Sequence, residues 1–401
     1  MSEELPVQRV EVSFVGAPPV QQMERASGVS DVETDGSILR CLVSGSFQPF
    51  LEALRGHEVI SLKSKSAYGS LFEGGDTHMK AIVYTQYGSP DVLQFKEVEQ
   101  PAPRENEVLV KVHAASVNAV DWHLLTADIF LVRLNAGLLK PKRAVLGSDI
   151  AGRVEAVGRN AKQFQPGDAV FGNVVGSFAE YVTAPESDLA LKPANLSFDE
   201  AAAVPLAAIT ALQGFRDKGH VQPGQKVLIN GASGGVGTFA VQIAKYFGAE
   251  VTAVCSTRNM DMARTLGADH VVDYTKEDFT QNGQQYDLIV AVNGYHPISA
   301  YRRALTPKGR YVMIGGTTIQ IFQALLLGPG MSRKQGRQLG ALMLKPNPND
   351  LPLLKELLET RKVVPLIDKR YPLSEVPDAL GYLGTGHARG KIVITVAGDT
   401  N

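Results

Sequence analysis

The sequence predicts an α/β protein with three parts: a small α+β module, a β-rich domain and a doubly wound parallel sheet. Residues 1–78 carry 11 acidic and 6 basic side chains, a net charge of −5, whereas the rest of the chain carries 30 and 34, a net charge of +4. Short strands separated by glycines dominate from residue 79 to about 190, and strands alternate with helices from residue 226 onward. The chain is therefore expected to divide close to Asp76.

The first part, residues 1–73, is expected to form a split-βαβ sheet. Apolar alternation and turn residues predict strands and helices in the order βαββαβ, at residues 10–14, 18–26, 29–34, 38–43, 47–54 and 59–62. Residues 74–78 are the predicted linker. Within this part, Cys41 is expected in the core and His57 at the surface.

The second part begins with strands at residues 79–84 and 108–112. Glycines then interrupt the apolar runs, a pattern typical of a compact β-barrel-like domain, at positions 147, 152, 158, 167, 172 and 176. Ser197 and Glu200 form a predicted capping box. The helix that follows, residues 201–214, is expected to break at Pro205.

A glycine turn begins the third part. A buried strand at residues 227–229 precedes it, and a helix follows with apolar residues on one face and Gln242 and Lys245 directed elsewhere. A second strand, residues 251–255, completes a βαβ unit. The turn has the spacing of a dinucleotide-binding fingerprint and gives the candidate cofactor-binding residues Ser233, Gly234, Gly235, Val236 and Gly237.

The end of the second strand of this unit indicates which dinucleotide binds. NAD sites place a carboxylate there, about 20 residues after the glycines, whereas this chain has Ser256 and Arg258 and no acid. Arginine holds phosphate oxygens through two parallel hydrogen bonds. The sequence therefore predicts NADPH, and the alternative is that Arg258 is a solvated surface residue.

Further strands are expected at residues 271–274, 288–292 and 311–314, with helices at 260–266 and 298–305. Helices at 351–359 and 374–382 and a last strand at 391–396, which returns to the β-rich domain, complete the chain. Residues 317–331 are apolar and are expected to line the substrate cleft or to lie in a subunit interface or the core. A subunit interface would make the protein a homodimer.

Composition excludes several classes of protein. A net charge of −1 gives no reason to expect nucleic acid as a partner, and two cysteines cannot form a disulfide framework or a four-thiolate zinc site. No basic and apolar leader opens the sequence, and no apolar stretch reaches the 18 residues of a membrane span. A cytoplasmic enzyme acting on a small molecule is the expectation.

Residues 79–401 resemble the zinc-independent quinone oxidoreductase branch of the medium-chain dehydrogenase/reductase superfamily. The matching motifs include SVNAVDW, LGSDIAGRVEAVG, VPLAAITAL, VLINGASGGVGTFAVQIAK and HARGKIVITV. The resemblance implies a GroES-like catalytic domain at residues 79–200 and 341–401 and a Rossmann domain at 201–340. It also implies a role beside the nicotinamide for Asn118, Thr210, Gly315 and Lys391, and one at the 2′-phosphate for Tyr274. The alternatives are packing for Tyr274 and a surface charge for Lys391.

Zinc-dependent members of this superfamily have a Cys near Ser116 and a His-Glu pair where Ser148 and Asp149 stand. This chain lacks those ligands, and His113 and His123 alone make a weak zinc site. No metal is therefore expected. Without a Lewis acid, reduction of a polarised double bond is favoured over alcohol oxidation.

Residues 1–73 resemble the domain that follows the nucleotide-binding domain in drug-export ABC transporter ATPase subunits. The matching stretch is GVSDVETDGSILRCLVSGSFQPFLEALRGHEVISL. The ATPase itself is absent, because the chain has no G-x-x-x-x-G-K-[ST] loop. A fused accessory module is the expectation.

These expectations predict hydride transfer from NADPH to a quinone or an α,β-unsaturated carbonyl. Asp121 is a candidate proton relay if burial raises its pKa, and a structural hydrogen-bonding residue otherwise. The alternatives are an NADPH-dependent aldehyde or ketone reductase, and a non-catalytic NADPH sensor in which residues 1–78 dock on a partner.

Overall fold

The structure is a computed structural model, and it describes residues 7–44, 46–66, 78–129, 133–134, 136–316 and 336–396. The apolar stretch 317–331 lies outside the described residues. The chain divides into two compact units, residues 1–77 and 78–401. None of the described helices is both long and apolar enough to cross a membrane.

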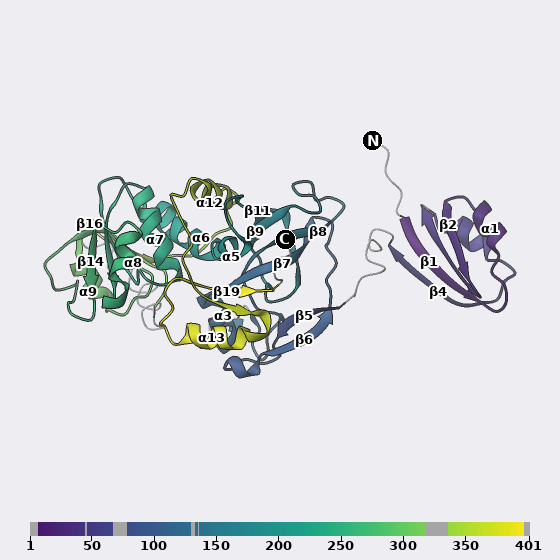
Figure 1. The fold of residues 1–401 in the computed structure, drawn as a ribbon, viewed down its shortest axis with the longest axis horizontal. Coiled ribbons are helices and arrows are strands. Elements are labelled where there is room, and N and C mark those ends of the chain that lie inside the picture. Colours follow the sequence, from purple (N-terminus) through teal and green to yellow (C-terminus); the bar gives the residue numbers. More distant parts are fainter. Residues whose placement is uncertain are drawn as a thin grey trace. The chain divides into compact units, whose positions relative to one another are not determined.

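The first unit is a four-stranded antiparallel sheet with two short helices (Figure 1). Its element order, βαββαβ, is the predicted one, and its sheet order is β2-β3-β1-β4. The bounds are β1 (Val7–Phe14), α1 (Val20–Arg25), β2 (Val29–Asp35), β3 (Ile38–Ser44), α2 (Gln48–Ala53) and β4 (Val59–Ser66).

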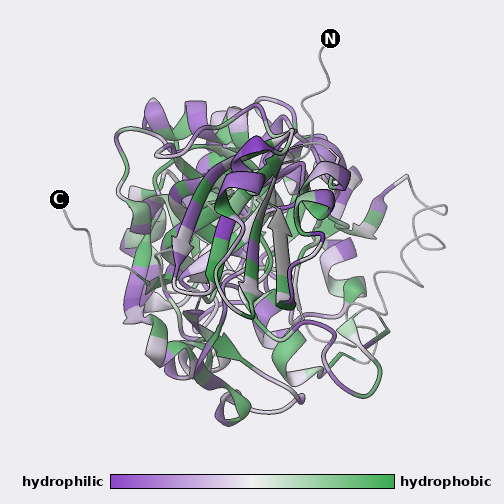
Figure 2. Ribbon diagram, turned by 90° about the vertical axis from the view of Figure 1, so that its right-hand side faces the viewer, coloured by the Kyte–Doolittle hydropathy of each residue, from purple (hydrophilic) through white to green (hydrophobic). Residues whose placement is uncertain are grey.

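Alternation along β1 and β3 gives this unit a core of its own. Val10, Val12 and Phe14 are buried on one face and pack with Met23 of α1 and Phe50 of α2. Figure 2 shows apolar and hydrophilic segments alternating along the strands. Cys41 belongs to this core, as predicted.

The second unit begins with the β-rich part. A seven-stranded sheet has the order β11-β9-β8-β7-β19-β18, with β10 also paired to β7, and a separate hairpin joins β5 to β6. The bounds are β5 (His78–Val83), β6 (Gln94–Glu99), β7 (Glu107–Val117), α3 (Ala119–Thr126), β8 (Asp149–Val157), β9 (Ala169–Asn173), β10 (Tyr181–Pro185), β11 (Leu189–Leu191), β18 (Ile367–Pro372), α13 (Val376–Gly384) and β19 (Lys391–Thr395). Because β19 pairs antiparallel with β7, the chain does return to this sheet at its end, as predicted.

The remaining elements form a six-stranded, fully parallel sheet with helices packed on it (Figure 1). Its order is β14-β13-β12-β15-β16-β17, the doubly wound pattern in which the strand order reverses between β12 and β15. The bounds are α5 (Phe198–Ala202), α6 (Pro205–Gln213), β12 (Lys226–Asn230), α7 (Gly235–Tyr246), β13 (Glu250–Cys255), α8 (Met260–Thr265), β14 (His270–Asp273), β15 (Tyr286–Ala291), α9 (Ile298–Arg303), β16 (Leu305–Met313), β17 (Gln338–Ala341) and α12 (Asp350–Glu359).

Two local predictions concern helices of this unit. The helix predicted at 201–214 is indeed broken before Pro205, which opens α6. Gln242, predicted to point away from the apolar face of α7, is nonetheless 5% exposed. Its side-chain oxygen accepts from the N–H of Val364 at 2.8 Å, and its amide nitrogen donates to the C=O of Val364 at 3.0 Å, so a segment outside the helix covers it.

The separate cores predict that residues 78–401 fold without the first unit. The melting temperature of that fragment, followed by circular dichroism, should stay within about 3 °C of the full chain's transition for this unit. A fragment starting at residue 101 is the matched control. It lacks β5 and β6, and with them the buried Ile82, and should melt clearly lower. A 78–401 fragment that aggregates or melts like the control would contradict the prediction.

Candidate active site

The predicted glycine turn lies where the strand order of the parallel sheet reverses, between the end of β12 and the start of α7. The amides of Gly235, Val236 and Gly237 occupy the first turn of α7 and have no intrahelical acceptor, and no side chain caps this end. A Cβ at Gly237 would lie 2.0 Å from the oxygen of Gly231, so this glycine is needed for helix packing. A Cβ at Gly234 would meet nothing closer than 3.8 Å, so open space lies in front of the turn. The arrangement suits an anionic group on the helix N-terminus.

The segment that leads into β19 contacts this turn directly. The N–H of Gly390 donates to the oxygen of Ser233 at 2.9 Å, and Gly390 forms a parallel bridge with Gly234. The next residue, Lys391, passes beside Gly235, where an added Cβ would lie 3.1 Å from its Cδ. The C-terminal strand therefore brings the β-rich part against the glycine turn.

At the carboxyl ends of β13 and β14, a shallow pocket of about 340 Å³ contains the residues predicted to select the dinucleotide. Ser256, Arg258 and Tyr274 line it together with His387. The guanidinium of Arg258 donates to the oxygen of His387 at 3.1 Å. Tyr274 is 51% exposed and its ring lies against that of Tyr295, with centroids 6.0 Å apart, so both its packing and its predicted role at the 2′-phosphate stay open.

One further carboxylate lies here that was not predicted from the sequence, that of Asp273. Asp273 is the parallel neighbour of Cys255, the last residue of β13. It accepts hydrogen bonds from the hydroxyls of Thr257 and Thr275, which lower its pKa to about 2. Its oxygens are therefore engaged within the protein rather than directed at a ribose. Asp273 lies beside Thr257, the neighbour of Arg258, because β13 pairs with β14. The sequence around Arg258 does not show this pairing.

A buried polar cluster lies at the other end of the turn, where β7, α3, β8 and β19 meet. We call this group the polar cluster: Ser116, Asn118, Asp121, Ser148, Asp149 and Lys391, each at most 7% exposed. The Asn118 amide accepts from Nζ of Lys391 at 2.5 Å and donates to Asp149 Oδ2 at 2.8 Å. Lys391 is 2% exposed, so the surface-charge alternative was wrong. Burial lowers its pKa, and the carboxylates of Asp149 and Asp121 oppose that shift.

Asp149 is the residue that sequence analysis missed. Besides Asn118, it accepts from Ser116 Oγ at 2.9 Å, from Asn173 Nδ2 at 3.1 Å and from the N–H of Leu206 at 2.9 Å, and Lys391 Nζ lies 3.6 Å away. Leu206 is in the first turn of α6, whose own N-cap side chain makes no capping bond. Asp149 therefore caps that helix from another element. The sequence does hold one sign of this contact: α6 begins at Val204-Pro205, where no neighbouring side chain can cap the helix, so a cap from elsewhere in the chain is needed.

Asp121 is completely buried and bonded on both oxygens. Oδ1 accepts from Ser148 Oγ at 2.7 Å, and Oδ2 accepts from the N–H of Asn118 at 2.8 Å. Burial raises its pKa to about 7, and these two hydrogen bonds oppose the shift only in part. Asp121 can therefore exchange a proton near neutral pH, and it also closes the first turn of α3.

The last two predicted residues flank this region. Thr210 lies on α6, one turn after Leu206, and its hydroxyl donates to the Leu206 oxygen at 2.6 Å. Gly315 follows β16, and a Cβ there would lie 2.5 Å from the oxygen of Val292. Hence side chains are excluded at the end of β16.

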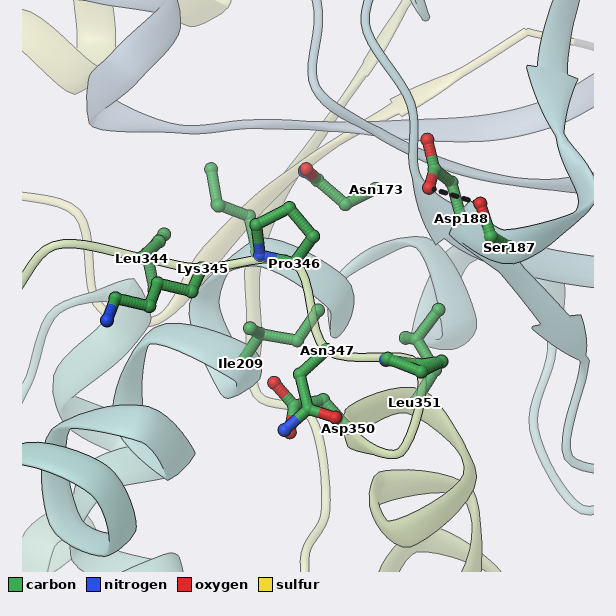
Figure 3. Close-up of a pocket in the computed structure, with 12 residues that line it drawn as sticks. Asn173, Ser187, Asp188, Ile209, Leu344, Lys345, Pro346, Asn347, Asp350 and Leu351 are labelled. Atoms are coloured by element: carbon green, nitrogen blue, oxygen red, sulfur yellow. Dashed lines mark hydrogen bonds between the residues drawn. The ribbon is translucent and has the colours of Figure 1, made fainter.

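A cavity of about 450 Å³ adjoins α6 (Figure 3). Leu206 and Ile209 form its α6 wall, segment 344–348 lies opposite, and Asn173 closes one side. Asn173 and the backbone of Leu206 also bond Asp149, so two residues of the cavity wall contact the polar cluster.

The two histidines considered as zinc ligands do not meet. His113 stacks on Phe198 with ring centroids 4.2 Å apart, and His123 pairs with Asp128 at 2.8 Å. Within the described ranges, no three His, Cys, Asp or Glu side chains are grouped so that they could hold a metal ion.

This architecture defines a class of protein, the two-domain dinucleotide-dependent oxidoreductases. Residues 104–194 match the family model of the alcohol dehydrogenase GroES-like domain, and residues 266–394 match that of zinc-binding dehydrogenase. A 2-methylene-furan-3-one reductase of Solanum lycopersicum is 35% identical over 89% of this chain and 91% of its own length. An NADPH-dependent alkenal/one oxidoreductase of Arabidopsis thaliana is 33% identical over 84% and 85%.

The solved structures include a quinone oxidoreductase from Coxiella burnetii that is 32% identical. It covers 80% of this chain and 100% of its own, with a TM-score of 0.71. The chain belongs to the medium-chain dehydrogenase/reductase superfamily, and its relatives are of the quinone oxidoreductase type. The fold class predicted from sequence is thereby confirmed.

The pKa of Asp121 predicts how stability changes with pH. The folded protein keeps a proton on Asp121 that the unfolded chain releases near pH 4, so this residue lowers stability as pH rises from about 4 to 7. Asp121→Asn has nearly the same shape and does not titrate. Relative to wild type, its free energy of unfolding should rise by on the order of 2 kcal/mol between pH 5 and pH 8.

Urea titrations at several pH values measure this difference. Asp261→Asn, at a carboxylate whose side chain is 99% exposed, is the control and should show no such trend. Unfolding curves of wild type and Asp121→Asn that move in parallel with pH would contradict the shift.

Proposed function

We propose that the protein transfers hydride from NADPH to a quinone or an α,β-unsaturated carbonyl without a metal. The observation that carries this proposal is that two sites lie at opposite ends of the glycine turn. A pocket with Arg258 and Ser256 lies at one end, and the polar cluster lies at the other. The substrates named for the tomato, Arabidopsis and Coxiella proteins support the same chemistry.

The residues present fit NADPH. The open space in front of Gly234 and the uncapped first turn of α7 suit a pyrophosphate. At the far end, Arg258 and Ser256 suit a 2′-phosphate, and the neighbouring carboxylate of Asp273 is engaged by threonines. When bound, the dihydronicotinamide supplies the hydride.

The residues of the chain would then orient the cofactor and the acceptor. Ser233 to Gly237 hold the phosphates, and Gly315 leaves room for the nicotinamide. Thr210, Asn118 and Lys391 would provide polar atoms beside the nicotinamide. Lys391 is held by Asn118 and Asp149 at the base of the cleft, where its charge favours electron density that develops on a carbonyl oxygen of the acceptor.

For Asp121 we propose a positioning role rather than a relay. Both of its oxygens are bonded within the protein, to the hydroxyl of Ser148 and to the backbone N–H of Asn118, so neither oxygen is directed at the cleft. Its position instead fixes the start of α3, and with it the side chain of Asn118. Solvent would supply the proton that completes the reduction.

Metal independence is supported by what surrounds Asp149. Its two oxygens already accept four hydrogen bonds and face Lys391. The ammonium group of Lys391 thus balances the negative charge of Asp149, which a metal cation would otherwise balance. Ser116 and Ser148 are hydroxyls and provide no thiolate or imidazole. An aldehyde or ketone reductase would need such an electrophile more than a reductase of conjugated double bonds does.

The activity itself is tested with purified, chelator-treated protein. NADPH oxidation, followed at 340 nm, should be saturable with members of a panel of quinones and 2-alkenals, and zinc addition should not raise it. Simple aldehydes and ketones should react at least about tenfold more slowly, since they lack the conjugated acceptor carbon. Turnover with no member of the panel would refute the proposal.

Arg258→Ala tests the cofactor assignment. Loss of a charge-assisted pair with the 2′-phosphate should weaken NADPH binding by about 10- to 100-fold and leave NADH binding unchanged. Arg264→Ala is the matched control, because Arg264 is an exposed arginine on α8 that pairs with Asp261 at 2.8 Å. Binding is measured by isothermal titration. If Arg258→Ala keeps the wild-type preference for NADPH, the assignment is wrong.

Cytoplasmic placement, homodimer formation and an ABC-accessory origin for residues 1–73 stay predictions from the sequence. The first unit has its own core and contributes no residue to the polar cluster or to the Arg258 pocket. We therefore propose that it is not required for turnover.

A further inference from the structure

A second cavity, of about 400 Å³, lies in the β-rich part of the second unit. Its inner wall is apolar and includes Leu124, Val145, Leu146 and Val175, with the ring of Tyr84, itself 4% exposed. Such a wall suits an aliphatic chain.

The segments that form this cavity also build the polar cluster. Gly147, in the cavity wall, directly precedes Ser148, and Leu124 lies on α3, the helix that begins after Asn118. Tyr84 lies close enough to Asp121 for that carboxylate to contribute to the raised pKa of the tyrosine. The cavity wall and the polar cluster are therefore built from the same segments of the chain.

Two consecutive cations stand at the rim, Lys142 and Arg143. Both are exposed, and no ion pair within the described ranges involves either of them. The segment from 129 to 148 contains four basic residues and no acid, although the whole chain has a net charge of −1. Two cations therefore stand at the mouth of the cavity, and within the described ranges neither has an ion-pair partner.

The loop that presents these cations is held by specific hydrogen bonds. The hydroxyl of Tyr87 donates to the oxygen of Gly137 at 2.6 Å, and the N–H of Lys142 donates to the oxygen of Ala136 at 2.8 Å. Gly137 has a φ of +124°, and a Cβ there would lie 2.0 Å from the oxygen of Lys140, so the turn requires glycine. The backbone carrying the cations is therefore set before any ligand arrives.

We propose that this cavity selects an α,β-unsaturated ketone whose aliphatic chain ends in a carboxylate. The chain lies against the apolar wall, and the carboxylate meets Lys142 and Arg143 at the rim, where arginine can form two parallel hydrogen bonds. This inference rests on the proposed function, since it assumes that the cleft reduces conjugated carbonyls.

The test compares 8-oxodec-9-enoic acid with its methyl ester, at equal NADPH. In each reduction a hydride from NADPH adds to C10, a solvent proton adds to C9, the double bond becomes single, and NADP⁺ leaves. Two exposed charge contacts should favour the acid over the ester by about 5-fold in kcat/KM, mostly through KM. Because the contacts are exposed, 0.5 M salt should reduce that ratio.

Lys142→Gln combined with Arg143→Gln should bring the ratio to about 1 while leaving turnover of the ester unchanged. Lys140→Gln is the matched control, since Lys140 is an exposed lysine of the same loop that does not line the cavity. It should keep the wild-type ratio.

Three outcomes would overturn the inference. Equal kcat/KM for acid and ester in wild type would overturn it and leave the proposed function standing. An unchanged ratio in the double variant, together with lost sedimentation on phosphatidylserine vesicles, would assign the cations to a lipid surface instead. Turnover of neither compound, nor of any quinone or enal, would refute the inference and the proposed function together.

Discussion

The carboxylate of Asp149 is the interaction on which the arrangement of the site depends. It accepts hydrogen bonds from side chains at the end of β7, directly before α3 and at the end of β9, and from a backbone N–H in the first turn of α6. It also faces the ammonium group of Lys391 on β19. A buried carboxylate is costly unless its oxygens are bonded and its charge is balanced. Here both conditions are met by residues from five elements, so those elements keep their relative positions as long as the charge stays buried.

This constraint also explains why Asn118 and Thr210 are oriented as they are. Asn118 spans Lys391 and Asp149 with its two amide atoms, which leaves its side chain a single orientation. Thr210 follows on the helix that Asp149 caps. The pair of Asp149 and Lys391 thus orients Asn118 in the β-rich part and Thr210 at the start of the doubly wound part. These are the polar groups proposed to lie beside the nicotinamide.

Much of the fold could be predicted because its signals are local. The glycine turn with a strand before it and a helix after it, and the break at Pro205, both lie within short stretches. Asp149, Asp273 and Gln242 could not be assigned, because their partners are 57, 16 and 122 residues away along the chain. Such long-range polar contacts are decided by strand pairing and by backbone groups that need partners, and neither is visible in a residue's own neighbourhood.

Gly390 and Lys391 are consecutive, yet the first bonds the glycine turn and the second reaches the polar cluster. Adjacent Cα atoms across a trans peptide are separated by a fixed distance of about 3.8 Å. The peptide between Gly390 and Lys391 therefore fixes the distance between the phosphate end and the reacting end of the cleft. Separation of the two ends of the cleft would therefore break the hydrogen bond from Gly390 to Ser233 and the bridge between Gly390 and Gly234.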